Sequence, residues 1–408
     1  MLTDSPTVKN TGHEDLADIK KPYVQRYFTG PYRRIQNFVF AERFIIGVYL
    51  LSRVLILLLA YVNTIIQHSH LSTELSNWDG VWYIRLAARG YPKHPLHIQS
   101  TLGFFPFYSM TMWVFARIFA GNLLISGLFI NFVGGLISSI LLFKLVEGWT
   151  DTKSARRAVV LYNLFPGTVI FSMVYSEGLT IPLAMGCILL VQQRRYVAAG
   201  VLAFFATATA PDALALVPVL FFAFFYELRH YKKPLRKARE ALIGTVVGLG
   251  GIASFGIFLW IWTGTPLASY EAQRYGWKES TTPFALYDQA KILIREFSSK
   301  HFGYSSVNLN YVVALLGALY LAVFLWHLFK PKLLISIPAL VWTLGVSFLA
   351  LTSARTPPNP RLLLTAFPLV AVAAYKFSGK GLKIYLGMSI VLLIYMSSVT
   401  FVGIALRP

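Results

Sequence analysis

The fold is decided by residues 44–66, the apolar run Phe-Ile-Ile-Gly-Val-Tyr-Leu-Leu-Ser-Arg-Val-Leu-Ile-Leu-Leu-Leu-Ala-Tyr-Val-Asn-Thr-Ile-Ile. It is the first of many apolar runs, several of them longer than the roughly 18 residues that mark a membrane-spanning helix. The chain of 408 residues is 56% hydrophobic and 13% charged, whereas soluble domains carry about 25% charged residues. These values exclude a soluble globular protein and predict an all-α polytopic membrane protein.

The apolar runs predict eleven spans. They are residues 44–66, 122–146, 157–174, 178–193, 197–210, 212–228, 241–263, 309–329, 333–353, 362–376 and 384–405. With a cytoplasmic N-terminus, the inner segments and their flanks hold 24 of the 37 Lys and Arg residues, which is the bias expected of membrane proteins. The net charge of +20 is therefore a topology signal and an attraction to anionic lipid headgroups. It does not indicate a nucleic-acid partner.

We expect residues 1–43 to be a polar cytoplasmic tail and residues 44–408 to form a single transmembrane domain. Two outer loops are long, residues 67–121 and 264–308. The N-terminal tail lacks the apolar core of a signal peptide, so the first span should act as a retained signal anchor. No segment is large enough for a separate soluble domain, and any activity must therefore be built from outer loops and span ends.

The aromatic segment 103–119 is apolar enough to cross the membrane. Counting it as a span would reverse every later loop and place Lys153, Arg156 and Arg157 outside. Because Trp and Tyr prefer the interface, we expect this segment to lie in or dip into the outer membrane surface.

The first outer loop carries one carboxylate among aromatic side chains. Residues 76–92 read Ser-Asn-Trp-Asp-Gly-Val-Trp-Tyr-Ile-Arg-Leu-Ala-Ala-Arg-Gly-Tyr-Pro, with Asp79 directly after the first Trp. A carboxylate at a membrane boundary is costly unless it is solvated or paired, so it favours chemistry at the water–lipid edge. The other reading is a cap for a short helix over residues 80–89.

The predicted topology places further polar residues on the same outer side: Tyr175, Ser176, Glu177, Asp212, Glu271, Gln273, Arg274, Trp277, Arg355 and Arg361. Carboxylates can act as general bases and bind sugar hydroxyls, and arginines bind phosphate through two parallel hydrogen bonds. Such a cluster fits an anionic, hydroxyl-rich substrate. Taken singly, Asp212 and Glu271 read more readily as loop tips or helix caps, and the arginines could be headgroup anchors. Glu177 lies between two apolar runs at the membrane edge, which favours a functional role.

Neither a metal nor a cofactor is indicated. The close histidines, His68 with His70 and His94 with His97, lack carboxylates at matching spacing, so we read them as solvated loop residues. The single cysteine, Cys187, lies in an apolar run, which excludes disulfides within the chain and cysteine-based metal sites.

The first-loop motif also carries a family resemblance. The stretch Asn77-Trp-Asp-Gly-Val-Trp-Tyr83, followed by Ile-Arg-Leu-Ala and Gly-Tyr, resembles the first-loop motif of the PIG-V family of mannosyltransferases. Four further matches follow in the family's order: Phe104-Phe-Pro-Phe-Tyr108; Leu164-Phe-Pro166 with Tyr175-Ser-Glu-Gly-Leu179; Ala206-Thr-Ala-Thr-Ala-Pro-Asp212; and Gln273 to Trp277. The resemblance is clear to about residue 280.

This resemblance implies the GT-C membrane glycosyltransferase fold and a sugar donor linked to a lipid phosphate. In that group an acidic residue of the first outer loop is the catalytic base, and Asp79 matches it. One position departs, because Ala210 stands where the family usually has arginine. If that arginine holds the donor phosphate, this chain must use another cation, for which Arg85, Arg355 and Arg361 are the candidates.

The mechanism that follows is a single displacement with inversion. Asp79 would take the proton of an acceptor hydroxyl that attacks the anomeric carbon, with an arginine stabilising the departing phosphate. Trp78, Trp82 and Tyr83 would stack on sugar faces or anchor the loop, and Glu177 would bond sugar hydroxyls.

We therefore predict transfer of a hexose, mannose by resemblance, from polyprenyl phosphate to a lipid-linked or cell-envelope glycan on the non-cytosolic face. The enzyme would lie in the plasma membrane if it comes from a bacterium and in the endoplasmic reticulum membrane if it comes from a eukaryote. The rival reading is a transporter or lipid flippase, which would place charges in mid-membrane. Only Arg53 lies clearly within a span, and the acidic residues lie at the outer edge, which favours an interfacial enzyme.

Overall fold

The computed structural model describes residues 31–94, 98–230, 235–298, 309–329, 334–356 and 358–401. The chain divides into two units, Met1–Phe44 and Ile45–Pro408. Within the described ranges every regular element is helical, and the one β-bridge, between Thr281 and Ser353, is isolated. The all-α prediction is confirmed. The predicted tail lies largely outside the described residues, as do His97 and the part of the last predicted span beyond Phe401.

The elements are α1 (Pro31–Gln67), α2 (Leu71–Ser76), α3 (Asp79–Arg89), η3 (Thr101–Gly103), α4 (Pro106–Ala116), α5 (Leu123–Trp149), α6 (Thr152–Asn163), η4 (Pro166–Ser172), α7 (Glu177–Gln192), α8 (Tyr196–Thr207), η5 (Pro211–Ala215), α9 (Leu216–His230), α10 (Leu235–Thr263), α11 (Ala268–Glu271), η6 (Ala272–Gly276), α12 (Ala285–Ser298), α13 (Leu309–Leu328), α14 (Ile337–Thr352), α15 (Pro360–Thr365), α16 (Pro368–Lys376) and α17 (Gly379–Phe401). Most η elements are 3₁₀ turns, while η6 is a short π-helix.

Six described helices are long and apolar enough to cross a membrane. They are Glu42–Gln67, Leu123–Trp149, Pro211–Arg229, Leu235–Thr263, Leu309–Leu328 and Gly379–Phe401. A seventh candidate is the pair η4 and α7, which is bent by 110°, and α8 and α14 are shorter apolar helices. The chain is therefore an integral membrane protein, although these helices do not confirm the predicted number of eleven spans.

Two predicted spans are interrupted. The run 157–174 is divided between α6 and η4, because Pro166 starts a tight 3₁₀ turn instead of continuing the helix. The run 362–376 is divided between α15 and α16, and Pro368 opens the second piece. The ambiguous segment 103–119 contains α4, whose 11 residues span about 16 Å, roughly half of the apolar thickness of a bilayer.

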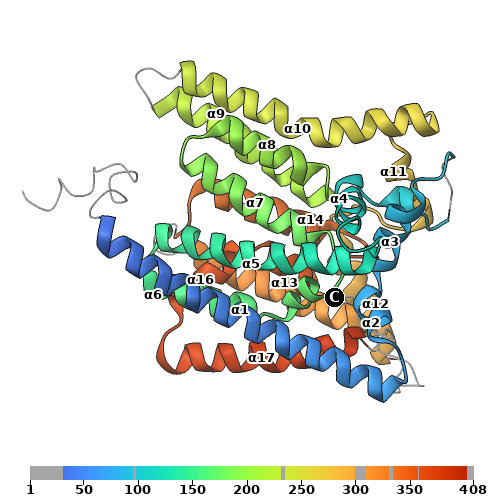
Figure 1. The fold of residues 1–408 in the computed structure, drawn as a ribbon, viewed down its shortest axis with the longest axis horizontal. Coiled ribbons are helices and arrows are strands. Elements are labelled where there is room, and N and C mark those ends of the chain that lie inside the picture. Colours follow the sequence, from blue (N-terminus) through green and yellow to red (C-terminus); the bar gives the residue numbers. More distant parts are fainter. Residues whose placement is uncertain are drawn as a thin grey trace, which may run out of the picture. The chain divides into compact units, whose positions relative to one another are not determined.

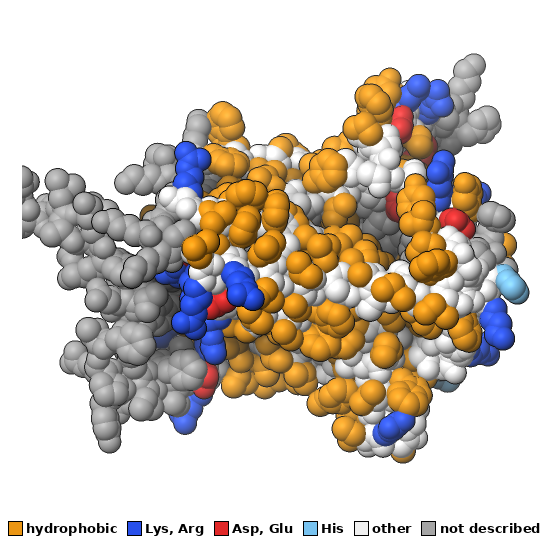
Figure 2. Space-filling model, turned by 90° about the horizontal axis from the view of Figure 1, so that it is seen from above, with side chains coloured by type: hydrophobic (Ala, Val, Ile, Leu, Met, Phe, Trp, Pro, Cys, Tyr) orange, Lys and Arg blue, Asp and Glu red, His pale blue; other side chains and the backbone are white. Residues whose placement is uncertain are grey.

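Within the second unit the long helices α5, α7, α8, α9, α10, α13 and α17 run side by side (Figure 1). The short helices α2, α3, α4, α11 and α12 gather at one end of these long helices (Figure 1). Exposed hydrophobic side chains cover the middle of the face in Figure 2, and charged side chains lie mostly toward its two edges. Examples of the exposed apolar residues are Val246, Ile261 and Leu319. This distribution suits a protein whose middle contacts lipid.

A close approach of α5 and α7 sets the position of Glu177. A Cβ added to Gly134 on α5 would lie 1.7 Å from the Gly178 carbonyl oxygen, and one added to Gly178 would lie 2.2 Å from Asn131 Oδ1. Only glycine lets the two backbones pack at this distance. The N-terminus of α7, which carries Glu177, is therefore fixed against the middle of α5.

We expect Gly134→Ala to destabilise the protein by about 1–3 kcal/mol, the usual cost of overpacking, and to lower activity because α7 must shift with Glu177. Gly256→Ala is the matched control, since a Cβ at Gly256 on α10 would meet no atom within 4 Å. Thermal unfolding in detergent should separate the two variants. Equal stability of both would show that the α5–α7 contact is not tight.

Candidate active site

The first part of the site is a break in the chain between η4 and α7. Backbone groups freed by such a break must find partners inside a membrane protein. The side-chain amide of Asn131 on α5 supplies them, donating to the carbonyls of Ile170 at 3.0 Å, Met173 at 2.7 Å and Tyr175 at 2.8 Å. Asn131 is fully buried, so it determines the path of the chain that leads to Glu177.

A buried arginine supports η4 from the other side. Arg53 on α1 donates to the Thr168 carbonyl at 2.7 Å and to the Thr168 hydroxyl at 2.8 Å. Its guanidinium lies 5.1 Å from the Tyr49 ring centroid and 5.9 Å from that of Phe171. Arg53, which the sequence places in the middle of the first predicted span, therefore stabilises the break.

Asp79 begins α3, and the residue before it has an unusual backbone. Trp78 is the N-cap with φ 63°, a conformation that costs a non-glycine residue about 1–3 kcal/mol. The Trp78 indole donates to the Thr400 carbonyl of α17 at 3.2 Å, which helps to hold this turn. The Val174 backbone amide also donates to the Leu75 carbonyl at 3.1 Å. The α2–α3 turn is thereby fixed against the η4–α7 break.

Arg361 is supplied by a third segment. Asn359 caps α15 by accepting from the Leu362 amide at 3.0 Å, and Pro360 occupies the first helical position, which proline favours. A Cβ on Gly167 of η4 would lie 2.1 Å from the Pro360 carbonyl oxygen. Glycine at position 167 therefore lets the start of α15 lie directly on η4, next to the break.

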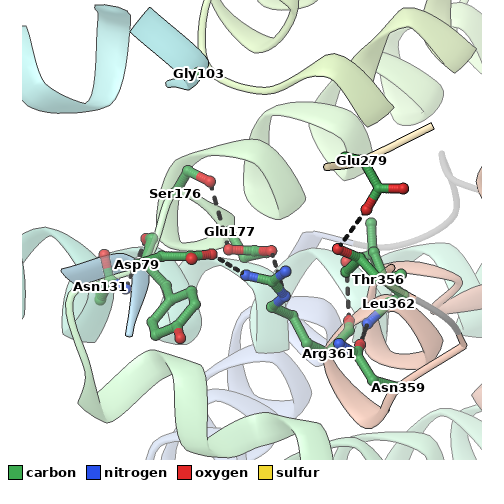
Figure 3. A network of polar contacts seen from close by, with 12 residues as sticks. Asp79, Gly103, Asn131, Ser176, Glu177, Glu279, Thr356, Asn359, Arg361 and Leu362 are labelled. Carbon is green, nitrogen blue, oxygen red and sulfur yellow. Dashed lines mark hydrogen bonds and ion pairs between the residues drawn. The ribbon is translucent and has the colours of Figure 1, made fainter. Parts of the chain in front are cut away.

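These three segments converge on one ion-pair cluster. The Arg361 Nη1 atom lies 2.6 Å from Asp79 Oδ2, and its Nε atom lies 3.3 Å from Glu177 Oε1. Figure 3 shows both carboxylates directed at the guanidinium. The guanidinium also lies 5.2 Å from the Tyr175 ring centroid. Asp212 on η5 is close enough for its charge to act on both Glu177 and Arg361.

Exposure differs within the cluster. The side chains of Asp79, Arg361 and Glu177 are 31%, 15% and 9% exposed, so Asp79 is the carboxylate that a substrate can reach most readily. Burial alone would lower the pKa of Arg361, but Glu177 and Asp79 outweigh it and raise that pKa above its ordinary value. Arg361 therefore stays a cation throughout the pH range in which proteins are stable.

A layer of aromatic side chains adjoins the cluster. Trp82 on α3 packs against Trp277 with ring centroids 4.9 Å apart and against Phe104 at 6.2 Å. Gln273 donates to the Gly103 carbonyl at 2.7 Å. The two outer loops that the sequence predicts as separate are thus joined here, and Gln273 acts as a link between them.

The remaining predicted residues lie around this layer. Tyr83 is buried, with ring centroids 4.9 Å from both Phe104 and Tyr108, and supports α3 from inside. Arg85 is exposed above the Trp82 ring, 4.5 Å from its centroid. Arg355 is exposed and donates to the Trp277 carbonyl at 3.1 Å. The roles predicted for these residues stay predictions.

Hydrogen bonds of Glu279 join the second long loop to the turn before Arg361. The Glu279 carboxylate accepts from the Arg355 amide at 3.2 Å and the Thr356 hydroxyl at 2.9 Å (Figure 3 draws the second contact). Glu279, Asn131 and Gly167 are not among the site residues that the sequence predicts. Of these, Asn131 gave a signal, since an amide in the middle of an apolar run is costly unless hydrogen-bonded.

No group of three or more His, Cys, Asp or Glu side chains within the described ranges could hold a metal ion. His68, His70 and His94 are exposed. Carboxylates and a guanidinium placed as in the cluster can transfer protons and bind anionic and hydroxyl groups.

We expect Asn131→Leu to destabilise the protein by about 3 kcal/mol, because it removes the donors to three buried carbonyls. Transfer activity should fall as well, since Glu177 loses its fixed position. Asn122→Ala on the same helix is the control, because it removes only the cap to the Ile125 amide, worth about 1 kcal/mol. Unfolding midpoints and turnover rates of both variants give the comparison, and an Asn131→Leu enzyme with normal kcat would argue against a positioning role.

A model described as mannosyltransferase (PIG-V) matches residues 38–263, more than half of the chain. The chain belongs to the PIG-V mannosyltransferase family. The match includes Asp79, Glu177 and Asp212, whereas Arg361 and the Gln273–Trp277 element of this PIG-V family member lie beyond it.

Two solved structures are similar to this chain. ArnT from Cupriavidus metallidurans bound to undecaprenyl phosphate is 13% identical, with 85% of this chain and 63% of that chain covered and a TM-score of 0.50. The Archaeoglobus fulgidus oligosaccharyltransferase in the apo form is 14% identical, with 86% and 56% covered and a TM-score of 0.46. The chain spans less than two thirds of the length of either. The match to ArnT confirms the GT-C fold. No curated protein matches the sequence.

Proposed function

We propose that this PIG-V family member transfers a hexose from a polyprenyl-phosphate donor to a lipid-linked or cell-envelope glycan, and that the hexose is mannose. The observation that carries the proposal is the meeting of Asp79, Glu177 and Arg361 from three distant segments. The family supports mannose as the sugar. The ArnT structure, which is bound to undecaprenyl phosphate, supports a polyprenyl-phosphate donor for the shared fold.

Asp79 is the general base in this mechanism, because it is the more exposed of the two carboxylates that pair with Arg361. It takes the proton of the acceptor hydroxyl as that oxygen forms a bond to the anomeric carbon. The bond from the anomeric carbon to the phosphate oxygen breaks, and the lipid phosphate leaves with the electron pair. One displacement inverts the anomeric configuration.

Arg361 supplies the fixed positive charge. Its guanidinium holds Asp79 through Nη1 and lies over Tyr175, so it is positioned before a donor binds. A preorganised cation stabilises the charge that grows on the leaving phosphate. In this chain Ala210 replaces the arginine usual in the family, and Arg361 is the cation nearest the base that can take its place.

The reaction belongs at the non-cytosolic face. The bias of Lys and Arg toward the opposite segments supports this side. The exposed apolar residues of the long helices support membrane insertion. In a bacterium the enzyme would act at the plasma membrane on envelope glycans, and in a eukaryote at the endoplasmic reticulum.

The test uses the purified full chain in nanodiscs with polyprenyl-phosphate-mannose and an extract of native membrane lipids. Mass profiling should find lipids that gain one hexose, together with free polyprenyl phosphate. Asp288→Asn is the control for substitutions in the cluster, since Asp288 is an exposed carboxylate of α12. Labelled mannose that crosses a vesicle membrane without covalent attachment would instead support a transporter.

A further inference from the structure

The turn that leads into α15 is fixed from behind by packing. It comprises the described residues 353–356 and 358–359 and ends shortly before Arg361. A Cβ added to Gly317 on α13 would lie 2.4 Å from the Pro358 carbonyl oxygen. Glycine at position 317 therefore lets α13 lie directly against the turn. This contact fixes the end of the turn that is nearest to Arg361.

The other end of the turn is held by the carboxylate of Glu279, in the second long loop (Figure 3). One oxygen, Oε2, accepts from the Thr356 hydroxyl at 2.9 Å, and the other, Oε1, accepts from the Arg355 amide at 3.2 Å. Oε1 also accepts from the Ser280 amide at 3.0 Å, and the Ser280 carbonyl accepts from the Ala354 amide at 2.9 Å. Because Glu279 and Thr356 are half-buried, water competes with their hydrogen bond less than it would at an exposed loop tip.

The same loop also contacts the helix of the proposed base. The Glu279 amide donates to the Gln273 carbonyl at 2.8 Å, and Trp277 lies between these two residues in the chain. The Trp277 indole packs on Trp82 of α3, with ring centroids 4.9 Å apart, and α3 begins at Asp79. A continuous series of contacts therefore runs from α3 through the second long loop to the turn that leads into α15. The base and the cation are linked by this route as well as by their own ion pair.

We propose that Glu279 is a positioning residue for hexose transfer, which sets the place of the Arg361 guanidinium relative to Asp79 by holding Thr356. The inference rests on the proposed function. The hydrogen bonds of the Glu279 carboxylate are with the loop and the turn, so it acts through the cation and not on the reacting groups. A preorganised charge stabilises a transition state only in the correct place, and a misplacement of about 1 Å costs about 100-fold in rate.

The experiment compares three variants at threonines that donate to a glutamate. Thr356→Val keeps the shape of the side chain but removes the donor, whereas Thr356→Ser keeps the hydroxyl. Thr152→Val is the matched control, because the Thr152 hydroxyl also donates to a glutamate, Glu147, at 2.9 Å, where α5 meets α6. Initial rates are measured in nanodiscs with polyprenyl-phosphate-mannose and native membrane lipids, and thermal unfolding is measured on the same preparations.

For Thr356→Val we expect kcat to fall by about 10–100-fold with little change in the KM for the donor, since the cation acts in the transition state. Thr356→Ser should recover most of the rate, and Thr152→Val should keep all of it. The unfolding temperature of each variant should lie within about 4 °C of that of the unmodified enzyme, because only one hydrogen bond is lost.

Two further variants test the route of the effect. Glu279→Ala removes the acceptor in place of the donor, so it should lower kcat by a similar factor, and it replaces Thr356→Val if that variant does not fold. In an Arg361→Lys background the geometry of the guanidinium is already lost. Adding Thr356→Val to this background should therefore cost only about 2-fold or less in rate.

Each outcome decides one proposal. A normal kcat in Thr356→Val overturns the positioning role, and so does a slow Thr356→Ser, because the hydroxyl would then not be the cause. An undiminished loss in the Arg361→Lys background overturns it too, since Glu279 would then not act through the cation. A kcat that falls only in step with the unfolding temperature would assign the contact to stability alone. The proposed function itself fails if the unmodified enzyme shows no Asp79-dependent release of polyprenyl phosphate, a result that no variant at position 356 can produce.

Discussion

Asp79→Asn is expected to lower the rate of hexose transfer by about 10²–10⁴-fold, the usual contribution of a general base. Asparagine keeps the shape of the side chain but cannot accept the proton of the acceptor hydroxyl. The ion pair between Arg361 and Glu177 at 3.3 Å remains, so the cluster should stay assembled. The measurement is the initial rate with purified enzyme in nanodiscs, together with the KM for the lipid donor.

A loss in kcat with little change in the donor KM would identify Asp79 as a group that acts in the transition state. Asp288→Asn, a change of the same chemistry on the surface of α12, should keep the full rate. If Asp79→Asn transferred hexose at the rate of the unmodified enzyme, the base would have to be another residue.

The sequence allowed the membrane class to be predicted, because that class depends on local composition, whereas the outer location of the candidate residues stays a prediction. Apolar runs identify spans, and the positions of Lys and Arg give their direction. The first-loop motif identifies Asp79 as a candidate from the sequence alone. Glu177 can also be predicted as a candidate, because an acidic residue between two apolar runs is costly without a partner.

The pairing itself could not be predicted. Arg361 and Asp79 are 282 residues apart, and their contact depends on the approach of α15 to η4 at Gly167 and on the break between η4 and α7. Residue periodicity does not reveal the break between η4 and α7. The backbone carbonyls that the break leaves without helical partners accept hydrogen bonds from Asn131, which lies on another helix. The spacing of residues along a single sequence does not show that Asn131 is the partner of these carbonyls.

The contacts within the aromatic layer could not be predicted from local sequence either. The sequence predicts that Trp82 contacts a sugar or the membrane, and the structure gives it Trp277 and Phe104 as neighbours. Residues 82 and 277 come from two loops that meet only in the folded chain, through Gln273 and Gly103. Single aromatic residues at an interface do not indicate which loop will pack on which.

Arg361→Met is expected to affect both stability and activity. Removing the cation leaves the nearly buried Glu177 carboxylate without its partner, which costs up to about 3–5 kcal/mol. The unpaired Asp79 carboxylate, 31% exposed, adds less because water reaches it. Transfer should fall by about 10²–10³-fold, since the preorganised cation near the leaving phosphate is lost. Thermal unfolding and initial rates measured on the same preparation give both numbers. Arg274→Met, at an exposed arginine of η6, should change neither by much.

A triple variant separates the two effects of Arg361. In Asp79→Asn/Glu177→Gln/Arg361→Met no charge of the trio remains, so the stability lost in Arg361→Met should largely return. Activity should stay absent, because the base and the cation are both gone. Recovered stability without activity would assign the Arg361→Met unfolding to unpaired carboxylates. A triple variant as unstable as Arg361→Met would mean that the packing of Arg361 on Tyr175, at 5.2 Å, dominates the stability of this cluster instead of its charge.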